Sequence, residues 1–208
     1  MERFAAFRHQ NFRRYFVGQV ISSVGTWLQA LAVTWLVLDL TGRSDRLGVA
    51  VALQFLPLLL LGAPAGVLAD RVDNRRLLMA TSAVSAGLAL AFGLVVSTGT
   101  ADLSVIYGLT LLSGLVLAVE RPAMQALLFQ LVGPETLPSA VAANTTIASV
   151  SRLVGPALGG AMVAVTGVAS CFYANAVSYV AVLIALASIS RSRLVPRPSS
   201  ARSRGGLR

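Results

Sequence analysis

The sequence predicts an all-α integral membrane protein with six transmembrane helices. Of the 208 residues, 56% are hydrophobic and only 12% are charged, whereas a typical soluble domain has about 25% charged residues. Six stretches are nearly free of charge, and most reach the roughly 20 residues that a helix needs to cross a bilayer. None alternates between polar and apolar residues as barrel strands do, and only helices and closed barrels satisfy their own backbone hydrogen bonds in lipid.

The six expected spans follow one another along the chain. They cover residues 15–38, 47–69, 77–97, 103–119, 140–165 and 168–190. The first span is too long for the apolar core of a secretory signal peptide, and it contains Trp27 and Trp35 without a clear cleavage site. We therefore expect it to remain in the mature protein.

The connections between the spans are short. On one side of the membrane we expect loops at 39–46, 98–102 and 166–167, and on the other a loop at 70–76 and a longer, partly amphipathic link at 122–138. These boundaries predict three regions: an amino-terminal segment (1–14), a six-helix bundle (15–190) and a tail (191–208). The tail is rich in Arg, Ser, Pro and Gly, so it cannot build a core and is expected to be disordered.

Arginine sets the expected orientation. All 17 basic residues are arginines. If the amino terminus is cytoplasmic, fourteen of them lie in cytoplasmic segments, Arg43 and Arg46 lie outside, and Arg152 lies within a span. This bias predicts a multi-pass protein of the cell membrane, inner or plasma, with both termini in the cytoplasm. The formal charge of +9 then favours contact with anionic lipid headgroups over nucleic acid.

A weak internal repeat divides the bundle into two triplets. The second span contains the sequence GAPAG at 62–66, and the fifth contains GPALGG at 155–160. Each span is the middle helix of its triplet. Glycine and proline at matching places are typical of a three-plus-three inverted repeat, which predicts that arrangement for the bundle.

The loop between the second and third spans carries the most specific motif. Residues 66–76 read GVLADRVDNRR, and this segment resembles the signature loop of the major facilitator superfamily. Asp73 replaces the glycine of the general motif, as is common in the branch of enterobactin and drug exporters, while Asn74 departs from the arginine usual there. An acid at a helix end followed by cations can form bonds present in one conformation only. The expected gating residues are Gly66, Asp70, Arg71, Arg75 and Arg76, with Glu120 and Arg121 as their cytoplasmic partners.

Two further segments resemble the same branch. Residues 122–128 (PAMQALL) match the stretch after the fourth helix, and residues 152–160 match the antiporter motif of the fifth helix, where Ser151 replaces an opening glycine. The motif residues there are Gly155, Pro156, Gly159 and Gly160. The resemblance implies the amino-terminal half of a twelve-helix transporter, in which two six-helix bundles rock about a central site. It implies export of a small molecule such as a drug or siderophore, usually coupled to protons, and a carboxy-terminal half or a second copy as partner.

Polar side chains form stripes within three spans. In the first span, six polar residues fall within roughly 140° of arc at 100° per residue, which is one helix face. The fourth and fifth spans carry similar stripes, which also include Thr110, Gly114, Pro156 and Gly159. Hydrogen bonding between helices is an alternative role for each serine or threonine. The residues expected to line a cavity or contact substrate are Gln19, Ser22, Thr26, Gln29, Tyr107, Thr145, Ser149 and Arg152.

Arg152 stands well inside the fifth span. An arginine near the bilayer centre costs roughly 3 kcal/mol on insertion scales, so it needs a partner or water. Its counter-charge could be an anionic substrate, Glu120 across a bent helix, or an acid of a second half. Glu120 is expected toward the cytoplasmic end of the fourth span, and no acid lies deep in the first span, so the residues leave the proton carrier unassigned.

Few other functions fit the composition. One His, one Cys and no paired acids within the spans argue against an enzyme and against a metal or other cofactor. No nucleotide-binding loop is present, which argues against an ATP-driven pump. Cys171 lies among apolar residues and is expected to pack. The alternatives are a non-transporting membrane subunit and an inactive truncated fragment of a transporter.

Overall fold

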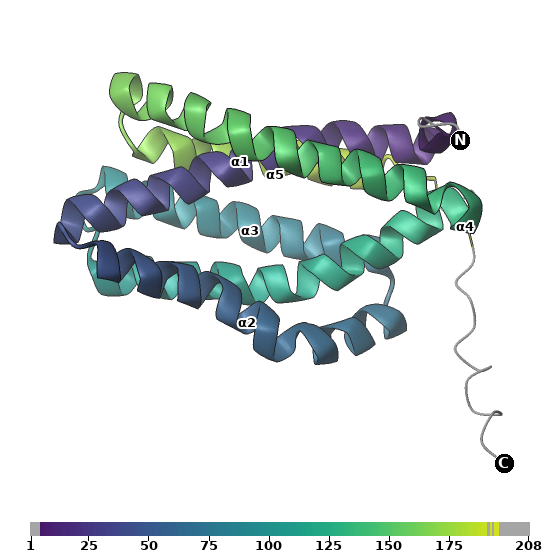
Figure 1. Ribbon diagram of the computed structural model, residues 1–208, viewed down its shortest axis with the longest axis horizontal. Coiled ribbons are helices and arrows are strands. Elements are labelled where there is room, and N and C mark those ends of the chain that lie inside the picture. The colour runs from purple at the N-terminus through teal and green to yellow at the C-terminus, as the bar shows by residue number, and fades with distance from the viewer. Residues whose placement is uncertain (1–4, 191, 193, 196–208) are drawn as a thin grey trace, which may run out of the picture.

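The computed structural model describes residues 5–190, 192, 194 and 195, and this part of the chain contains helices and no strands (Figure 1). A short 3-10 helix, η1 (Ala5–Arg8), precedes α1 (Gln10–Thr41), α2 (Ser44–Arg71), α3 (Asn74–Ser97), α4 (Leu103–Thr166) and α5 (Ala169–Ala187). All five α helices are long and apolar enough to cross a membrane. An all-helical membrane protein is thus confirmed, although five helices, not six, are continuous in the part described.

The helix α4 is longer than one membrane crossing needs. This helix has 64 residues and would be about 96 Å long if straight, roughly three times the hydrocarbon thickness of a bilayer. It reverses direction at Gly133, whose φ of 75° and ψ of 175° are not helical (Figure 1). Only glycine adopts such angles readily, and Pro134 suits the first position of the helix that follows. We call residues 103–132 the first arm of α4 and residues 134–166 the second arm.

The link expected at 122–138 is therefore mostly helical, and the fourth span does not end at 119. Pro122 and Pro138 lie inside helical segments. Proline is tolerated within membrane helices because neighbouring groups satisfy the freed carbonyls. Gly133 alone interrupts the helix, and its neighbour Thr136 donates a 2.7 Å hydrogen bond to the carbonyl of Val132.

Helix ends match the expected connections. Gly42 ends α1 in a left-handed conformation, with φ of 61°. Asp73 begins α3 by accepting hydrogen bonds from the backbone of Arg75 and Arg76. Asp102 begins α4 by accepting from Ser104, and these hydrogen bonds hold the pKa of the Asp102 carboxyl below its usual range.

Small residues bring the helices into close contact. A Cβ added at Gly114, on the first arm of α4, would lie 2.5 Å from the carbonyl oxygen of Gln54 on α2. A Cβ added at Gly155, on the second arm, would lie 2.4 Å from the Cβ of Trp27 on α1. Both distances are too short for any side chain, so glycine at these two positions sets the spacing of α4 from α2 and α1.

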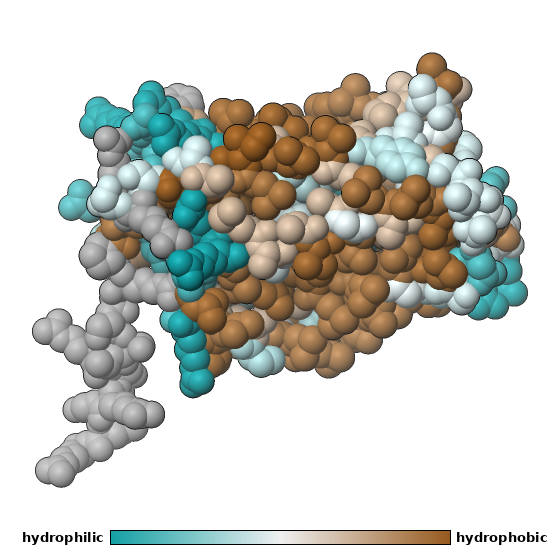
Figure 2. Space-filling model, turned by 180° about the vertical axis from the view of Figure 1, so that it is seen from behind, coloured by the Kyte–Doolittle hydropathy of each residue, from teal (hydrophilic) through white to brown (hydrophobic). Residues whose placement is uncertain are grey.

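The outer surface is apolar around its middle. Figure 2 shows a broad band of hydrophobic side chains on one face, with hydrophilic side chains gathered at the two ends of the molecule. The most exposed large apolar residues are Leu59, Leu60, Leu153, Val165, Val177 and Ile184. Such a band is what a bilayer would cover, and together with the five apolar helices it describes a multi-pass membrane protein.

Two apolar clusters fill the interior. One contains Phe12, Leu127 and Leu186, and lies toward the end of the bundle where Gly133 bends α4. The other contains Leu36, Ile106 and Phe172, and lies toward the opposite end. Polar side chains of the same helices fall between these clusters along the sequence. The bundle thus has a polar layer near its middle.

Candidate functional site: an interior polar cavity

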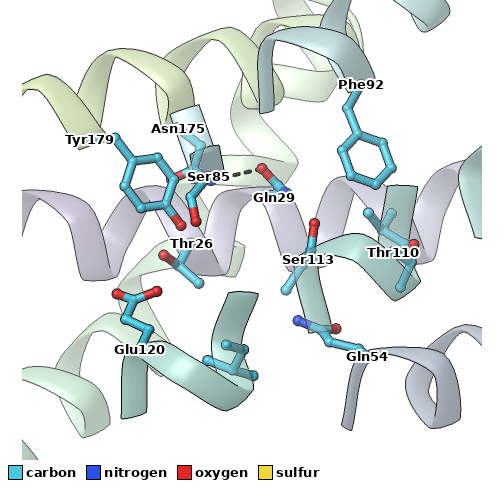
Figure 3. Close-up of a pocket in the computed structure, with 13 residues that line it drawn as sticks. Thr26, Gln29, Gln54, Ser85, Phe92, Thr110, Ser113, Glu120, Asn175 and Tyr179 are labelled. Atoms are coloured by element: carbon cyan, nitrogen blue, oxygen red, sulfur yellow. Dashed lines mark hydrogen bonds between the residues drawn. The ribbon is translucent and has the colours of Figure 1, made fainter. Parts of the chain in front are cut away.

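A cavity of about 60 Å³ lies in the polar layer (Figure 3). All five α helices contribute to its wall. This volume holds a few water molecules but is far below the roughly 300–1,000 Å³ of ordinary small-molecule sites. Its lining residues are Thr26, Gln29, Ala30, Val33, Gln54, Ser85, Phe92, Thr110, Ser113, Leu117, Glu120, Asn175 and Tyr179.

One wall is held by amide groups of α1 and α5. The side-chain nitrogen of Asn175 donates a 2.7 Å hydrogen bond to the side-chain oxygen of Gln29. Ser178 in turn donates to the side-chain oxygen of Asn175 at 3.0 Å. Gly25 permits this arrangement, because a Cβ there would lie 2.3 Å from the Ser178 hydroxyl oxygen. The network fixes the amides and leaves the nitrogen of Gln29 facing the cavity region.

Two threonine hydroxyls of the cavity wall bond to their own helices. Thr26 donates to the carbonyl of Ser22 at 2.9 Å, and Thr110 donates to the carbonyl of Ile106 at 2.7 Å. A hydroxyl that donates in this way keeps acceptor capacity for another group. These side chains can therefore accept hydrogen bonds from water in the cavity.

Glu120 is the only acid that lines the cavity. It lies inside the first arm of α4, seventeen residues after Leu103 and thirteen before Gly133, or about 25 Å and 20 Å from the two ends of that arm at 1.5 Å per residue. The helix continues to Val132 and does not end at 119 as expected, so Glu120 lies near the middle of the first arm, somewhat closer to its Gly133 end. Its side chain is half-buried. Thr26 lies between its carboxylate and the Tyr179 ring (Figure 3).

The residues expected to line a cavity fall in three places. Thr26 and Gln29 line the interior cavity. Ser22 is buried and Gln19 half-buried on α1, but neither lines it. Tyr107 lies toward the other end of the bundle from Gly133, where its hydroxyl donates a 2.7 Å hydrogen bond to the carbonyl of Arg46.

A separate polar face lies on the second arm of α4. Thr145, Ser149 and Arg152 are exposed there, and we call these three residues the α4 polar face. The Arg152 guanidinium carbon lies 5.4 Å from the centre of the Trp27 ring. The structure does not bring Arg152 to Glu120, since neither forms an ion pair within the described part of the chain.

Sequence reasoning missed several cavity residues: Gln54, Ser85, Ser113, Asn175 and Tyr179. Each lies on a helix whose other residues are mostly apolar, although Asn175 and Tyr179 share one face of α5 four residues apart. Gln54 and Asn175 could have been identified by their amide side chains, because an amide within an apolar span needs a hydrogen-bond partner.

Arg75 and Arg76, at the start of α3, form bonds at the end of the bundle where the loop at 70–76 lies. The Arg75 guanidinium donates to the carbonyls of Leu186 and Ala187 at the end of α5, at 2.6 and 2.8 Å. Arg76 forms a 3.6 Å ion pair with Asp73. Arg75 thus neutralises the carbonyl end of a helix, a favourable place for a cation.

The other gating candidates lie on α2 and α4. Asp70 and Arg71 are exposed in the last turn of α2, and Arg121 is exposed on α4. Gly66 has open space beside it. Glu120 is in the interior of α4, away from the end of the bundle where the loop lies.

The motif at 155–160 is a packing surface. Gly155 and Gly159 are buried against α1, where an added Cβ at Gly159 would lie 2.8 Å from a methyl carbon of Leu31. Pro156 lies inside the helix and is half-buried. Gly160 is exposed with open space beside it. Two of the three glycines therefore serve contact with α1.

Comparison with known proteins gives a family match over nearly the whole chain. Residues 1–202 match a family described as "Transmembrane secretion effector", a family of the major facilitator superfamily. No solved structure matches the chain significantly.

Curated relatives are bacterial transporters. The chain is 30% identical to the Staphyloferrin A transporter of Staphylococcus aureus over 188 residues, which are 89% of this chain and 47% of that protein. It is 29% identical to the enterobactin exporter EntS of Salmonella choleraesuis, over 91% of this chain and 46% of that protein. It is 25% identical to the multidrug efflux pump Tap of Mycobacterium bovis, over 82% of this chain and 42% of that protein. The chain therefore spans about half the length of the relatives it matches.

Proposed function

Because the chain belongs to the major facilitator superfamily, in the family of transmembrane secretion effectors, we propose that it forms the amino-terminal bundle of a proton-coupled exporter of small molecules. Transporters of this superfamily are not enzymes, and they move a substrate across the bilayer. In the proposed protein, a second six-helix bundle faces this one, and the two bundles rock about a substrate site between them.

The observation that carries the proposal is the exposure of Arg152 within an apolar helix. Its guanidinium is at the surface of this bundle, nineteen residues from Gly133, or about 28 Å along the second arm of α4. A cation at that depth is costly when it faces lipid and is stable when it borders water or protein. The α4 polar face thus borders a water-filled cavity that a second bundle closes.

The interior cavity is too small to be the substrate site. At about 60 Å³ it holds water, whereas drugs and siderophores need sites of several hundred Å³. Substrate instead binds at the exposed α4 polar face, between the bundles. Arg152 and its Trp27 neighbour give this face a cation and an aromatic ring, which suits substrates with carboxylates and flat apolar parts.

The bend of α4 at Gly133 supports a proposed topology. Each arm crosses the membrane once, so the bundle has six crossings in a three-plus-three arrangement. The arginine-rich end, with the amino terminus, the loop at 70–76 and the Gly133 bend, is cytoplasmic in the cell membrane. The Asp70 loop lies at this end and acts as the cytoplasmic gate.

Reconstitution tests the proposal. The chain is placed in liposomes alone and together with the carboxy-terminal bundle of a matching transporter, and efflux of drugs and siderophores is followed. We expect efflux only from the two-bundle assembly. Efflux by the chain alone as a monomer, or none by any assembly, contradicts the proposal, and the second result favours a non-transporting subunit.

A further inference from the structure

We propose that Glu120 carries the coupling proton of the exporter, with the interior cavity as the water-filled chamber through which that proton reaches it. This inference rests on the proposed function, because a coupling proton is needed only if the protein transports. It also moves Glu120 from the gate, where the sequence placed it, to the coupling site.

The position of Glu120 is the first argument. Among the described residues, every other acid lies at or next to a helix end or at the Gly133 bend. Glu120 alone is well inside a membrane-spanning arm, and it lines a cavity large enough for water. A carboxyl can take up and release a proton without any other bond changing. The other acids are Asp39, Asp45, Asp70, Asp73, Asp102 and Glu135.

The second argument is that no cationic side chain pairs with Glu120 among the described residues. In the part of the chain that the structure describes, the Glu120 carboxylate forms no hydrogen bond and no ion pair. Arg121 is next in sequence but exposed, because successive residues of a helix point about 100° apart. A charged carboxylate without a partner costs far more to bury than a neutral carboxyl does. The side chain can therefore exist in both states, as a carrier must.

The groups around Glu120 suit both states. The titratable or charged groups near it are Tyr15 on α1, Tyr179 on α5 and Arg121 on its own helix. The cavity residues of α2 and α3, Gln54 and Ser85, are neutral. Hydroxyls can donate to the carboxylate and accept from the carboxyl. Arg121 is the permanent charge among these groups, and its exposed side chain forms no ion pair with Glu120 in the part of the chain that the structure describes.

Tyr15 is a candidate relay toward the cytoplasmic end. Its hydroxyl is buried, and it is a side-chain polar atom without a hydrogen-bond partner among the described residues. Such an orphaned group calls for an explanation. Tyr15 lies five residues after the start of α1, between the arginine-rich end and the level of Thr26. A water between Tyr15 and Glu120 would satisfy the hydroxyl and extend the path of the proton.

The step itself is a proton exchange. Water on one side of the membrane gives a proton to the Glu120 carboxylate, an O–H bond forms, and the carboxyl later returns the proton to water on the other side. No electrons move and no other bond changes. Coupling arises because the neutral and charged forms favour different conformations of the bundle, and a few kcal/mol of difference are enough to shift such an equilibrium.

The first experiment uses the 208-residue chain in liposomes. Infrared difference spectra between acidic and alkaline buffer report the carbonyl band of a protonated carboxyl. All eight acids of the chain contribute to this band, so we expect Glu120→Gln to remove the component of the buried carboxyl, and Glu135→Gln, a matched change of the acid at the bend, to keep that component. A spectrum in which Glu120→Gln leaves the band unchanged overturns the proposal.

The second experiment uses the two-bundle assembly. A coupling residue is needed for efflux driven by a pH gradient but not for exchange of substrate across the membrane without one. We expect Glu120→Gln to lose at least tenfold in gradient-driven efflux while exchange persists, and Glu120→Asp to restore part of the coupling. Unchanged gradient-driven efflux, or equal loss of exchange, overturns the role of Glu120. Absence of all transport in the wild type instead overturns the proposed function.

Discussion

The Arg152 guanidinium lies over the Trp27 ring, with 5.4 Å between the guanidinium carbon and the ring centre. Arg152 is on the second arm of α4 and Trp27 is on α1. Gly155, three residues after Arg152, lets these two helices approach closely. A cation and an aromatic ring at this distance attract each other by about 0.5–1 kcal/mol when exposed. The pair holds the arginine at the surface of the bundle, where a substrate or a second bundle can reach it.

Removing the charge at this position should impair transport far more than it impairs expression. We expect Arg152→Ala to lower efflux by the two-bundle assembly at least tenfold, because the substrate loses its cation. Arg152→Lys keeps the charge but loses the planar fork, so its efflux should be intermediate. Thr146→Ala, an exposed change on the same helix, is the control. Equal efflux by Arg152→Ala and the wild type would contradict a substrate role.

Glycine at position 114 should be essential for the contact between α2 and α4. Gly114→Ala places a Cβ 2.5 Å from the Gln54 carbonyl oxygen, and overpacking of this kind costs about 1–3 kcal/mol. Gly108→Ala is the matched control on the same arm, because its Cβ would have nothing within 4 Å. Thermal unfolding in detergent should show a lower midpoint for Gly114→Ala only. A lower midpoint for both variants would show that the contact with α2 is not the cause.

Arg75 should stabilise the end of α5. Its guanidinium donates to the Leu186 and Ala187 carbonyls, so Arg75→Ala should lower the free energy of unfolding by about 1–2 kcal/mol. Arg76→Ala removes only an exposed ion pair with Asp73 and should cost less than about 1 kcal/mol. Hydrogen exchange at the last turn of α5 measures the difference. Equal protection in both variants would show that Arg75 does not hold this end.

Asp70 should be essential for the proposed cytoplasmic gate. We expect Asp70→Asn to leave membrane insertion intact and to abolish efflux by the two-bundle assembly, because the neutral amide cannot form the charged bonds that close the cytoplasmic side. Asp102→Asn, a change of the helix-capping acid before α4, should leave efflux unchanged. Membrane fractionation and efflux rates measure both effects. Wild-type efflux rates in Asp70→Asn would refute the gate.

The membrane fold could be predicted from sequence because lipid leaves few choices. Long apolar runs must be helices, and the expected loops at 39–46, 70–76 and 98–102 lie where α1, α2 and α3 end. The end of the fourth span, expected at 119, could not be predicted correctly. Pro122 and Pro138 suggested an irregular link, but prolines fit within membrane helices, and only the backbone angles of Gly133 reverse the chain.

The polar cavity could be predicted only in part. The stripe on α1 drew attention to Thr26 and Gln29, which do line the interior cavity. The same reasoning could not decide which polar residues face inward and which face outward. That choice depends on how closely the helices pack, and contacts at Gly114 and Gly155 join residues far apart in the sequence.

The most direct test of the account is the access of water to position 152. Arg152→Cys is made in a variant in which Cys171, the chain's one cysteine, is replaced, and the two-bundle assembly is treated with water-soluble thiol reagents. If the α4 polar face borders a transport cavity, the new thiol reacts, and added substrate slows the reaction. If the thiol is inaccessible in every state of the transporter, this face is covered by lipid or protein, and the central claim fails.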